Sequence, residues 1–343
     1  MSANAASILA RLPRDTSLFA VVKANGYGHG AVPVARAAVV GGATGLAVAT
    51  LEEAEQLRGL ANEDRILVMG GVPPHVAPAA AASGFAITVS SMDVAKALDD
   101  QGSVVPVHLK IDTGMGRFGC APEEAASLAA FIDKAHGLRL AGTLTHFASA
   151  DSDEAMTRRQ FDTFTQALET LGVDAGIRHA CNSAGARRYP EFALDAVRAG
   201  IALYGCEWPE TRPALGLRSV VTHLKTIGVG ETVGYGATWR AKARTQVATV
   251  GIGYADGVQR ARSNRGHVLV RGRPAPLIGV VSMDAITVDV SDVGGVQPGD
   301  VVTVIGEDRG ERITAEEVAE WSKTISWEVL SAIGPRVERR YSE

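Results

Sequence analysis

Several residues able to bind anions or transfer protons follow short apolar segments. Lys23 follows FAVV, and Lys110 and Asp112 end the segment VPVHLKID. A lysine at the end of a buried strand is partly desolvated, which lowers its pKa and favours the neutral amine needed for a Schiff base. Taken alone, Lys23 fits equally well a lysine whose ammonium group only reaches solvent from the strand end.

Other polar residues follow later apolar segments. They are His146, Asn182, Ser183 and Arg198. If these segments are the strands of one parallel barrel, their carboxyl ends meet at one rim, where barrel enzymes carry their active sites. We therefore expect these side chains to converge.

Short β-branched runs alternate with Ala-rich amphipathic stretches up to about residue 213, which predicts βα repeats. Eight strands are expected, at 18–22, 46–49, 66–69, 86–89, 105–111, 140–146, 177–181 and 195–201. Helices are expected between them, among others at 30–40, 51–60, 91–100, 121–135 and 153–171. Eight repeats predict an α/β fold with an N-terminal (β/α)8 barrel. The alternative, an open dinucleotide-binding sheet, lacks its fingerprint because Gly26, Gly28 and Gly30 are spaced G-x-G-x-G.

The pattern changes after Pro213 to strands separated by Gly, Pro and Asp turns. Strands are expected at 219–228, 231–235, 245–251, 266–270, 276–280, 285–290 and 300–305. Thr314-Ala-Glu-Glu predicts a capping box that opens a helix to about Lys323, with a second helix at 326–333. The expected domains are a barrel over 1–213 and a mostly β domain over 214–343.

Composition excludes several classes of protein. The net charge of −4 with dispersed Lys and Arg gives no broad surface for nucleic acid, and no apolar run is long enough for a membrane span. Cys120, Cys181 and Cys206 are odd in number and lack CxxC spacing, so we expect reduced thiols in a cytoplasmic protein. No metal site is expected, because the scattered histidines, His108 among them, show no ligand spacing.

The chemistry-bearing segments resemble those of a known family. AVVKANGYGHG (20–30) resembles the cofactor-lysine motif of alanine racemases, which use pyridoxal 5′-phosphate (PLP). Eight further motifs follow in the same order: KIDTGMGRFG, THFASAD, CNSAGA, VRAGIALYG, VGYGATW, GYADG, SMDAI and RVERRY. Together they extend over nearly the whole chain and imply the family's barrel and β domain.

The resemblance implies a two-base racemisation of L- and D-alanine in which Lys23 and Tyr235 act on opposite faces of the substrate. Lys23 also binds PLP as a Schiff base, and Tyr235 reaches the barrel of a partner subunit, so a homodimer with shared sites is implied. The other implied cofactor residues are Tyr27, His146, Asn182, Ser183, Arg198, Gly200, Ile201 and Tyr341. D-alanine for peptidoglycan is the implied physiological product.

The substrate residues are implied in the same way. Arg117 and the Met283 backbone of the partner bind the carboxylate, and Lys110 resembles a position that is often carbamylated. Tyr254 and Asp284 are expected in supporting positions, although Asp256 and Asp284 lie in turn-forming contexts that favour structural roles. The family's opening W-x-E-I-D strand has no counterpart before Asn4, so we expect its absence to affect stability and dimer contacts rather than the chemistry.

Three other functions stay open on the sequence. A racemase of broader range, acting on serine or lysine, requires a wider site entrance near Tyr254 and Met283. A PLP-homeostasis protein has the barrel but lacks the second domain and therefore the second base. A Schiff-base aldolase on a similar barrel would not bind PLP.

Overall fold

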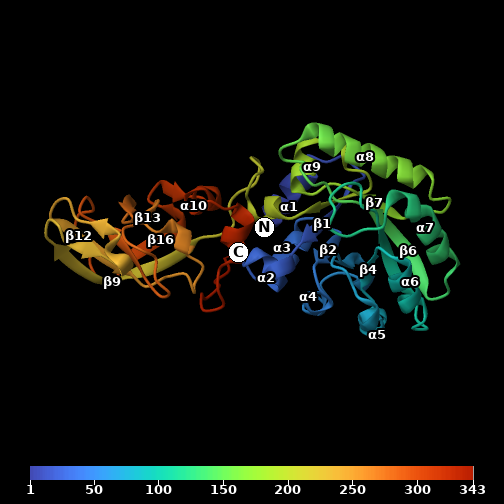
Figure 1. Cartoon of the computed structure of the whole chain (residues 1–343), viewed down its shortest axis with the longest axis horizontal. Helices are drawn as coiled ribbons and strands as arrows, with labels where there is room; N and C mark the ends of the chain where they lie inside the picture. The colour runs from blue at the N-terminus through green and yellow to red at the C-terminus, as the bar shows by residue number, and fades with distance from the viewer. Residues whose placement is uncertain (343) are drawn as a thin grey trace. The chain divides into compact units, whose positions relative to one another are not determined.

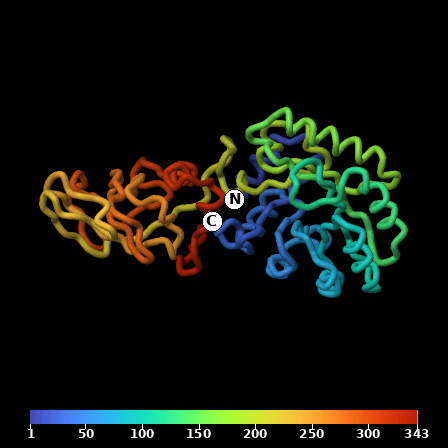
Figure 2. Tube along the Cα trace, in the orientation of Figure 1, coloured from blue at the N-terminus to red at the C-terminus, as the bar shows by residue number. Residues whose placement is uncertain are grey.

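The computed structural model describes residues 1–342 of the chain. Its contacts divide the chain into two compact units, residues 1–26 with 30–212 and residues 27–29 with residues 213 onward. One unit alternates strands and helices and the other consists mostly of strands (Figure 1). Figure 2 follows the chain through each of them.

The first unit is a barrel of eight parallel strands in the order β7-β6-β5-β4-β3-β2-β1-β8. The strands are β1 (Ser17–Val21), β2 (Gly45–Val48), β3 (Ile66–Val68), β4 (Ala86–Val89), β5 (Val105–Lys110), β6 (Leu138–Leu144), β7 (Ile177–His179) and β8 (Ala196–Ala199). The ends of this order are joined, because Asp195 N donates to Arg178 O over 3.1 Å and Arg198 N to Cys181 O over 2.9 Å. The predicted (β/α)8 barrel is therefore confirmed.

One helix precedes the first strand of this unit, and further helices follow most of the strands. They are α1 (Ser2–Leu9), α2 (Lys23–Tyr27), α3 (Ala31–Val40), α4 (Leu51–Glu55), α5 (Ala77–Ser83), α6 (Met92–Asp99), α7 (Ala125–Lys134), α8 (Glu154–Glu169) and α9 (Ser183–Arg188). Thr50, Ser91 and Asp153 cap three of them by accepting backbone N–H bonds, as their types favour. α6, α7 and α8 lie outside the strands (Figure 1).

Helix α1 was not expected from the sequence. It buries Asn4, whose Nδ2 donates to Leu203 O over 3.0 Å and to Arg212 O over 2.8 Å. Arg212 N in turn donates to Asn4 Oδ1 over 2.9 Å. The helix is thereby fixed to the last part of the barrel unit.

The second unit is an antiparallel β structure. Its main sheet has the order β14-β13-β16-β9-β12-β15, with β17 paired to β16 and β10 paired to β11. The strands are β9 (Leu217–Ile227), β10 (Thr232–Val233), β11 (Trp239–Arg240), β12 (Thr245–Val250), β13 (His267–Val270), β14 (Arg273–Pro276), β15 (Ile286–Asp289), β16 (Val301–Asp308) and β17 (Glu311–Ile313). Helices α10 (Ala315–Ser322) and α11 (Ser326–Ser331) follow, and Thr314 forms the predicted capping box with Glu317.

Two strand predictions in this unit are wrong. The strand expected at 276–280 instead runs from Arg273 to Pro276 and pairs with β13, because Arg271 and Gly272 form a two-residue turn with φ of 54° and 75°. β14 tolerates its prolines because it is an edge strand. The strand expected at 231–235 ends at Val233, because Gly234 has a φ of 74°. Within residues 1–342 the longest helix is α8, with 16 residues, and none has the length and apolarity needed to cross a bilayer.

Candidate active site

Four cationic or imidazole side chains lie at or just beyond the carboxyl ends of barrel strands. Lys23 lies two residues beyond β1, Lys110 ends β5, His146 lies two residues beyond β6, and Arg198 lies in β8. In a parallel barrel these ends share one rim, which is where catalytic residues collect. The convergence expected from the sequence is supported by this placement.

The turn after Lys23 has an unusual backbone. Ala24, Asn25 and Gly26 have φ values of 52°, 53° and 60°, so α2 is a left-handed turn rather than a right-handed helix. Left-handed backbone is unfavourable for alanine by roughly 1–2 kcal/mol and needs compensating contacts. Glu53 supplies them, because its carboxylate accepts from Ala24 N over 2.6 Å and from Ala49 N over 2.8 Å. Glu53 thus links the turn that carries Lys23 to the end of β2.

Lys23 is half-buried at this turn. Burial lowers the pKa of its ammonium group, and the nearby positive charge of Arg117 lowers it further, while Glu53 acts in the opposite direction. The neutral amine is therefore more accessible than in a lysine exposed to water. This is the protonation state required of a nucleophile or a base.

Lys110 is more deeply buried. Its Nζ atom lies 3.3 Å from the ring centroid of Phe118. Burial, followed by the charges of Arg198 and Arg117, lowers the pKa of Lys110 to about 7. Lys110 is thus divided between ammonium and amine near neutral pH.

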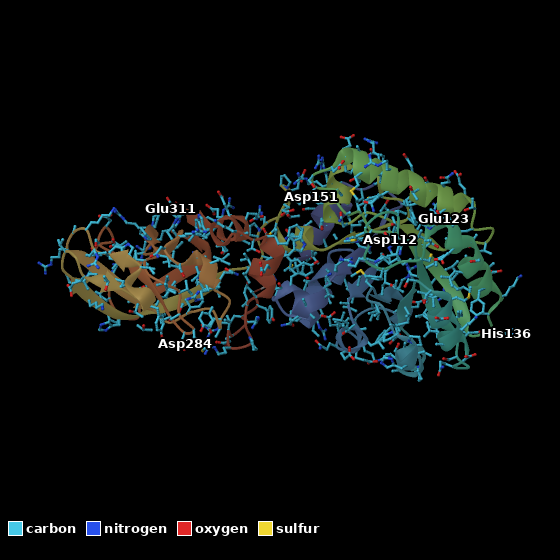
Figure 3. All side chains as sticks on the ribbon, in the orientation of Figure 1. Asp112, Glu123, His136, Asp151, Asp284 and Glu311 are labelled. Carbon is cyan, nitrogen blue, oxygen red and sulfur yellow. The ribbon has the colours of Figure 1, made fainter. Side chains whose placement is uncertain are left out.

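Arg117 lies on an exposed loop that Asp112 shapes. The Asp112 carboxylate accepts from the backbone N–H groups of Gly114, Met115 and Gly116 over 3.0, 2.8 and 2.9 Å. Figure 3 labels Asp112 on the barrel unit. The loop therefore has a defined course, and the Arg117 guanidinium is available to an anionic ligand.

Arg198 is the most deeply buried cation of this rim, at 2% exposure. Its Nη1 donates to His179 Nδ1 over 2.7 Å and to His179 O over 2.9 Å. Its Nη2 donates to Thr145 O over 2.7 Å, to Ala180 O over 2.9 Å and to His146 Nδ1 over 3.2 Å. The Nε–H has no partner among the described residues. Burial lowers the pKa of Arg198 to about 10, so the group is still a cation at neutral pH and presents one buried donor to a ligand.

Ser183 joins the end of β8 to the start of α9. Its Oγ accepts from Gly200 N over 3.0 Å and from Ala202 N over 3.3 Å. The neighbouring Asn182, which was expected to bind a cofactor, uses its Oδ1 to cap α9 by accepting from Gly185 N over 2.9 Å. The predicted cluster around Ser183 and Gly200 is thus brought together, with Ile201 next in the chain.

The β unit carries the second group of predicted residues. Tyr235 is 73% exposed in a turn between Gly234 and Gly236, both with positive φ. Tyr254 N donates to Ser282 O over 3.0 Å and Ala255 N to Met283 O over 3.1 Å, so the GYADG and SMDAI loops are paired. Tyr254 and Met283 are both exposed beside this pairing.

The two turn aspartates share one arginine. Asp256 Oδ1 lies 2.9 Å from Arg336 Nη2, and Asp284 Oδ1 lies 2.8 Å from Arg336 Nη1. Asp256 also accepts from Gly253 N over 2.8 Å. These contacts support a structural role for both carboxylates; Asp284 is labelled on the β unit in Figure 3.

Tyr27 and Tyr341 both belong to the second unit. Tyr341 donates its hydroxyl to His29 O over 3.0 Å. Tyr27 is buried, which raises the pKa of its phenol to about 12. A phenol with this pKa is a hydrogen-bond donor at neutral pH and not a base.

Sequence reasoning missed Glu53, His179 and Arg336. Most of their partners lie 19 or more residues away in the chain, and neither residue type nor spacing indicates which groups they meet. A signal existed only for His179, a polar residue within the apolar segment IRHAC.

The fold and the rim define a (β/α)8-barrel enzyme whose site combines a lysine of lowered pKa with buried cationic donors. Residues 1–207 match the family model for the alanine racemase N-terminal domain, and residues 214–341 match that for the C-terminal domain. The chain belongs to the alanine racemase family.

Curated relatives and solved structures agree with this assignment. The alanine racemase of Symbiobacterium thermophilum is 42% identical over 348 residues, covering 97% of this chain and 92% of the relative. The crystal structure of alanine racemase from E. faecalis is similar with a TM-score of 0.92 and 37% identity, covering 98% of this chain and 94% of that one. The alanine racemase structure from Bacillus anthracis with bound L-Ala-P has a TM-score of 0.90 and 37% identity, covering 98% and 91%.

Proposed function

We propose that this chain interconverts L- and D-alanine by a two-base reaction with PLP bound at the barrel rim. The observation that carries the proposal is the buried Nε–H of Arg198, which lacks a partner within residues 1–342 while the other nitrogens of this guanidinium are bonded. A buried donor without a partner is costly, so a ligand acceptor is expected there. The pyridine nitrogen of PLP is such an acceptor.

The other residues at the rim fit the same group. PLP, when bound, withdraws electrons from the substrate and so acidifies its α-hydrogen. Lys23 supplies the amine that holds PLP covalently. Ser183, Gly200 and Ile201 offer hydroxyl and backbone groups to its phosphate, and the family resemblance adds Tyr27 and Tyr341.

Arg198 also limits how far electrons are withdrawn. A guanidinium donates a hydrogen bond but keeps its proton at neutral pH, so Arg198 would leave the ring nitrogen of bound PLP uncharged. His146 receives a bond from the same guanidinium and has a pKa far below its usual value, because it is buried and close to Arg198 and Lys110. His146 is therefore a neutral acceptor that helps to orient Arg198.

Racemisation needs proton transfer on both faces of the α-carbon. Lys23 is assigned to the D-alanine side, where its lowered pKa suits a base. Tyr235 is assigned to the L-alanine side. Its phenol is 73% exposed in the single chain, so it is free to enter the barrel rim of a second copy, and we propose a homodimer with two shared sites.

The substrate carboxylate is assigned to Arg117 and to the backbone of Met283 from the partner. A planar guanidinium binds a carboxylate through two parallel hydrogen bonds. Lys110 carries the proposed carbamate, whose negative charge would attract Arg117 where an ammonium would repel it. D-alanine made in this way would serve peptidoglycan synthesis in the cytoplasm.

The test separates the two faces by isotope exchange. Tyr235→Phe is expected to slow α-deuterium exchange of L-alanine far more than that of D-alanine, while Lys23→Ala abolishes PLP attachment. Wild-type protein supplied with L-serine and L-lysine addresses the broader racemase, which predicts comparable kcat/KM for all three substrates. Equal losses on both alanine enantiomers in Tyr235→Phe would refute the assignment of Tyr235.

A further inference from the structure

Two histidines lie inside the barrel and have no place in the proposed reaction. His108 on β5 is 1% exposed and His179 on β7 is fully buried. His108 Nδ1 lies 2.8 Å from His179 Nε2, and His179 Nδ1 lies 2.7 Å from Arg198 Nη1. The three side chains form a buried chain that ends at the Arg198 guanidinium, whose Nε finds no partner in the described part of the protein.

The direction of every bond in this chain is fixed by Arg198. A guanidinium only donates, so His179 Nδ1 must accept and its proton must lie on Nε2. His179 Nε2–H then donates to His108, so His108 Nδ1 must accept and its proton must lie on Nε2. Both imidazoles are therefore neutral and hold one defined tautomer.

The electrostatics agree with this assignment. Burial, followed by the charge of Arg198, lowers the pKa of His179 far below its usual value. Burial, with Arg198, Arg65 and Arg139, lowers the pKa of His108 to about 3. Neither ring takes up a proton in the physiological range.

Packing holds the rings in place. The Phe19 ring stacks on His179 with centroids 5.6 Å apart and meets His108 edge-on at 6.2 Å. A Cβ at Gly142 would lie 2.6 Å from the His108 ring, so glycine is required there. The β5–β6 register also shifts between Val107 and His108.

The far side of His108 borders a cavity. His108 lines a cavity of about 910 Å³ together with Arg65, Arg139, Arg178 and residues that precede β7 and β8. Among the described residues, the side chain of His108 makes one hydrogen bond, from its Nδ1 to His179. A void made at His108 would therefore be reachable by a small molecule from this cavity.

We propose that His108 is a positioning residue for Arg198. It acts through His179, because His108 Nδ1 accepts a hydrogen bond from His179 Nε2–H and thereby fixes the tautomer of His179. With Nδ1 of His179 kept as an acceptor, Arg198 stays where its Nε–H can meet a ligand. The role in catalysis rests on the proposed PLP function, but the tautomer assignment does not.

A matched pair of variants separates hydrogen bonding from packing. His108→Asn keeps an acceptor oxygen near the place of Nδ1, whereas His108→Leu has nearly the same shape and no acceptor. We expect His108→Leu to weaken PLP binding by about tenfold or more and to shift the visible absorbance of the bound cofactor. We expect His108→Asn to change the affinity and the absorbance little. Because the side chains are of similar size, equal losses of PLP affinity in the two variants would refute the proposal.

Two further measurements do not depend on activity. Imidazole nitrogen-15 NMR of cofactor-free wild-type protein is expected to show His108 and His179 as neutral Nε2–H tautomers from pH 5 to 9. In His108→Gly, imidazole that enters through the cavity is expected to restore PLP affinity. A buffer of equal ionic strength without imidazole is not expected to restore it. An Nδ1–H or cationic His108 overturns the inference even if racemisation is confirmed, and a correct tautomer in a protein without PLP binding overturns only the proposed function.

Discussion

The Nζ atom of Lys110 lies over the ring of Phe118, 3.3 Å from its centroid, at a buried position. The ring face stabilises an ammonium group, and burial destabilises it more, since the pKa of Lys110 is lowered to about 7. Lys110 therefore reaches the neutral form, which reacts with carbon dioxide, at physiological pH.

Labelling with carbon-13 carbon dioxide tests this relationship. The carbamate needs the amine, so at a fixed concentration of dissolved carbon dioxide the NMR signal is expected to be strong at pH 8 and to fall roughly thirtyfold or more by pH 5.5, below a pKa of about 7. Phe118→Leu removes the stabilisation of the ammonium and is expected to move the midpoint to lower pH. Lys110→Arg is expected to lose the signal and the exposed Lys134→Gln to keep it; a signal that survives in Lys110→Arg would disprove the site.

Gly253 allows the two loops around Met283 to approach each other. A Cβ at this position would lie 2.3 Å from Met283 O, a backbone atom that cannot move aside independently. Gly253→Ala is expected to shift the Met283 backbone and raise the KM for alanine on the order of tenfold. Gly294→Ala, where nothing lies within 4 Å, is the control, and steady-state kinetics with both enantiomers is the measurement. An unchanged KM in a folded Gly253→Ala protein would argue against a substrate role for Met283.

The capping box of α10 makes a separate contribution to stability. Thr314 Oγ1 accepts from Glu317 N over 3.2 Å, and Glu317 Oε2 accepts from Thr314 N over 2.8 Å. Thr314→Ala is expected to lower the free energy of opening of the helix start by ~1 kcal/mol, while Thr314→Ser changes it little. Hydrogen exchange of the first-turn amides measures this, and equal protection in the Ala and Ser variants would contradict it.

The barrel could be predicted because its strands are buried on both faces and read as short continuous apolar runs, as AITV in β4 does. The hairpin at Arg271 and Gly272 could not, because Arg-Gly is an uncommon pair for a two-residue turn and Pro274 reads as a break. The sequence pattern also placed Lys23, Lys110 and Arg198 at the ends of barrel strands, where the structure has them. The buried chain from Arg198 through His179 to His108 could not be predicted, since His108 and His179 are 71 residues apart and meet only when the barrel forms.

Tyr235 is exposed, so if it completes the site of a second copy, as proposed, activity would be a property of pairs rather than of single chains. Lys23→Ala and Tyr235→Phe subunits, each inactive alone, would complement each other on mixing, because a hybrid keeps one complete site. Random re-pairing of the two variants would recover about a quarter of the wild-type rate. Progressive dilution of the wild-type protein would dissociate the pairs and abolish activity.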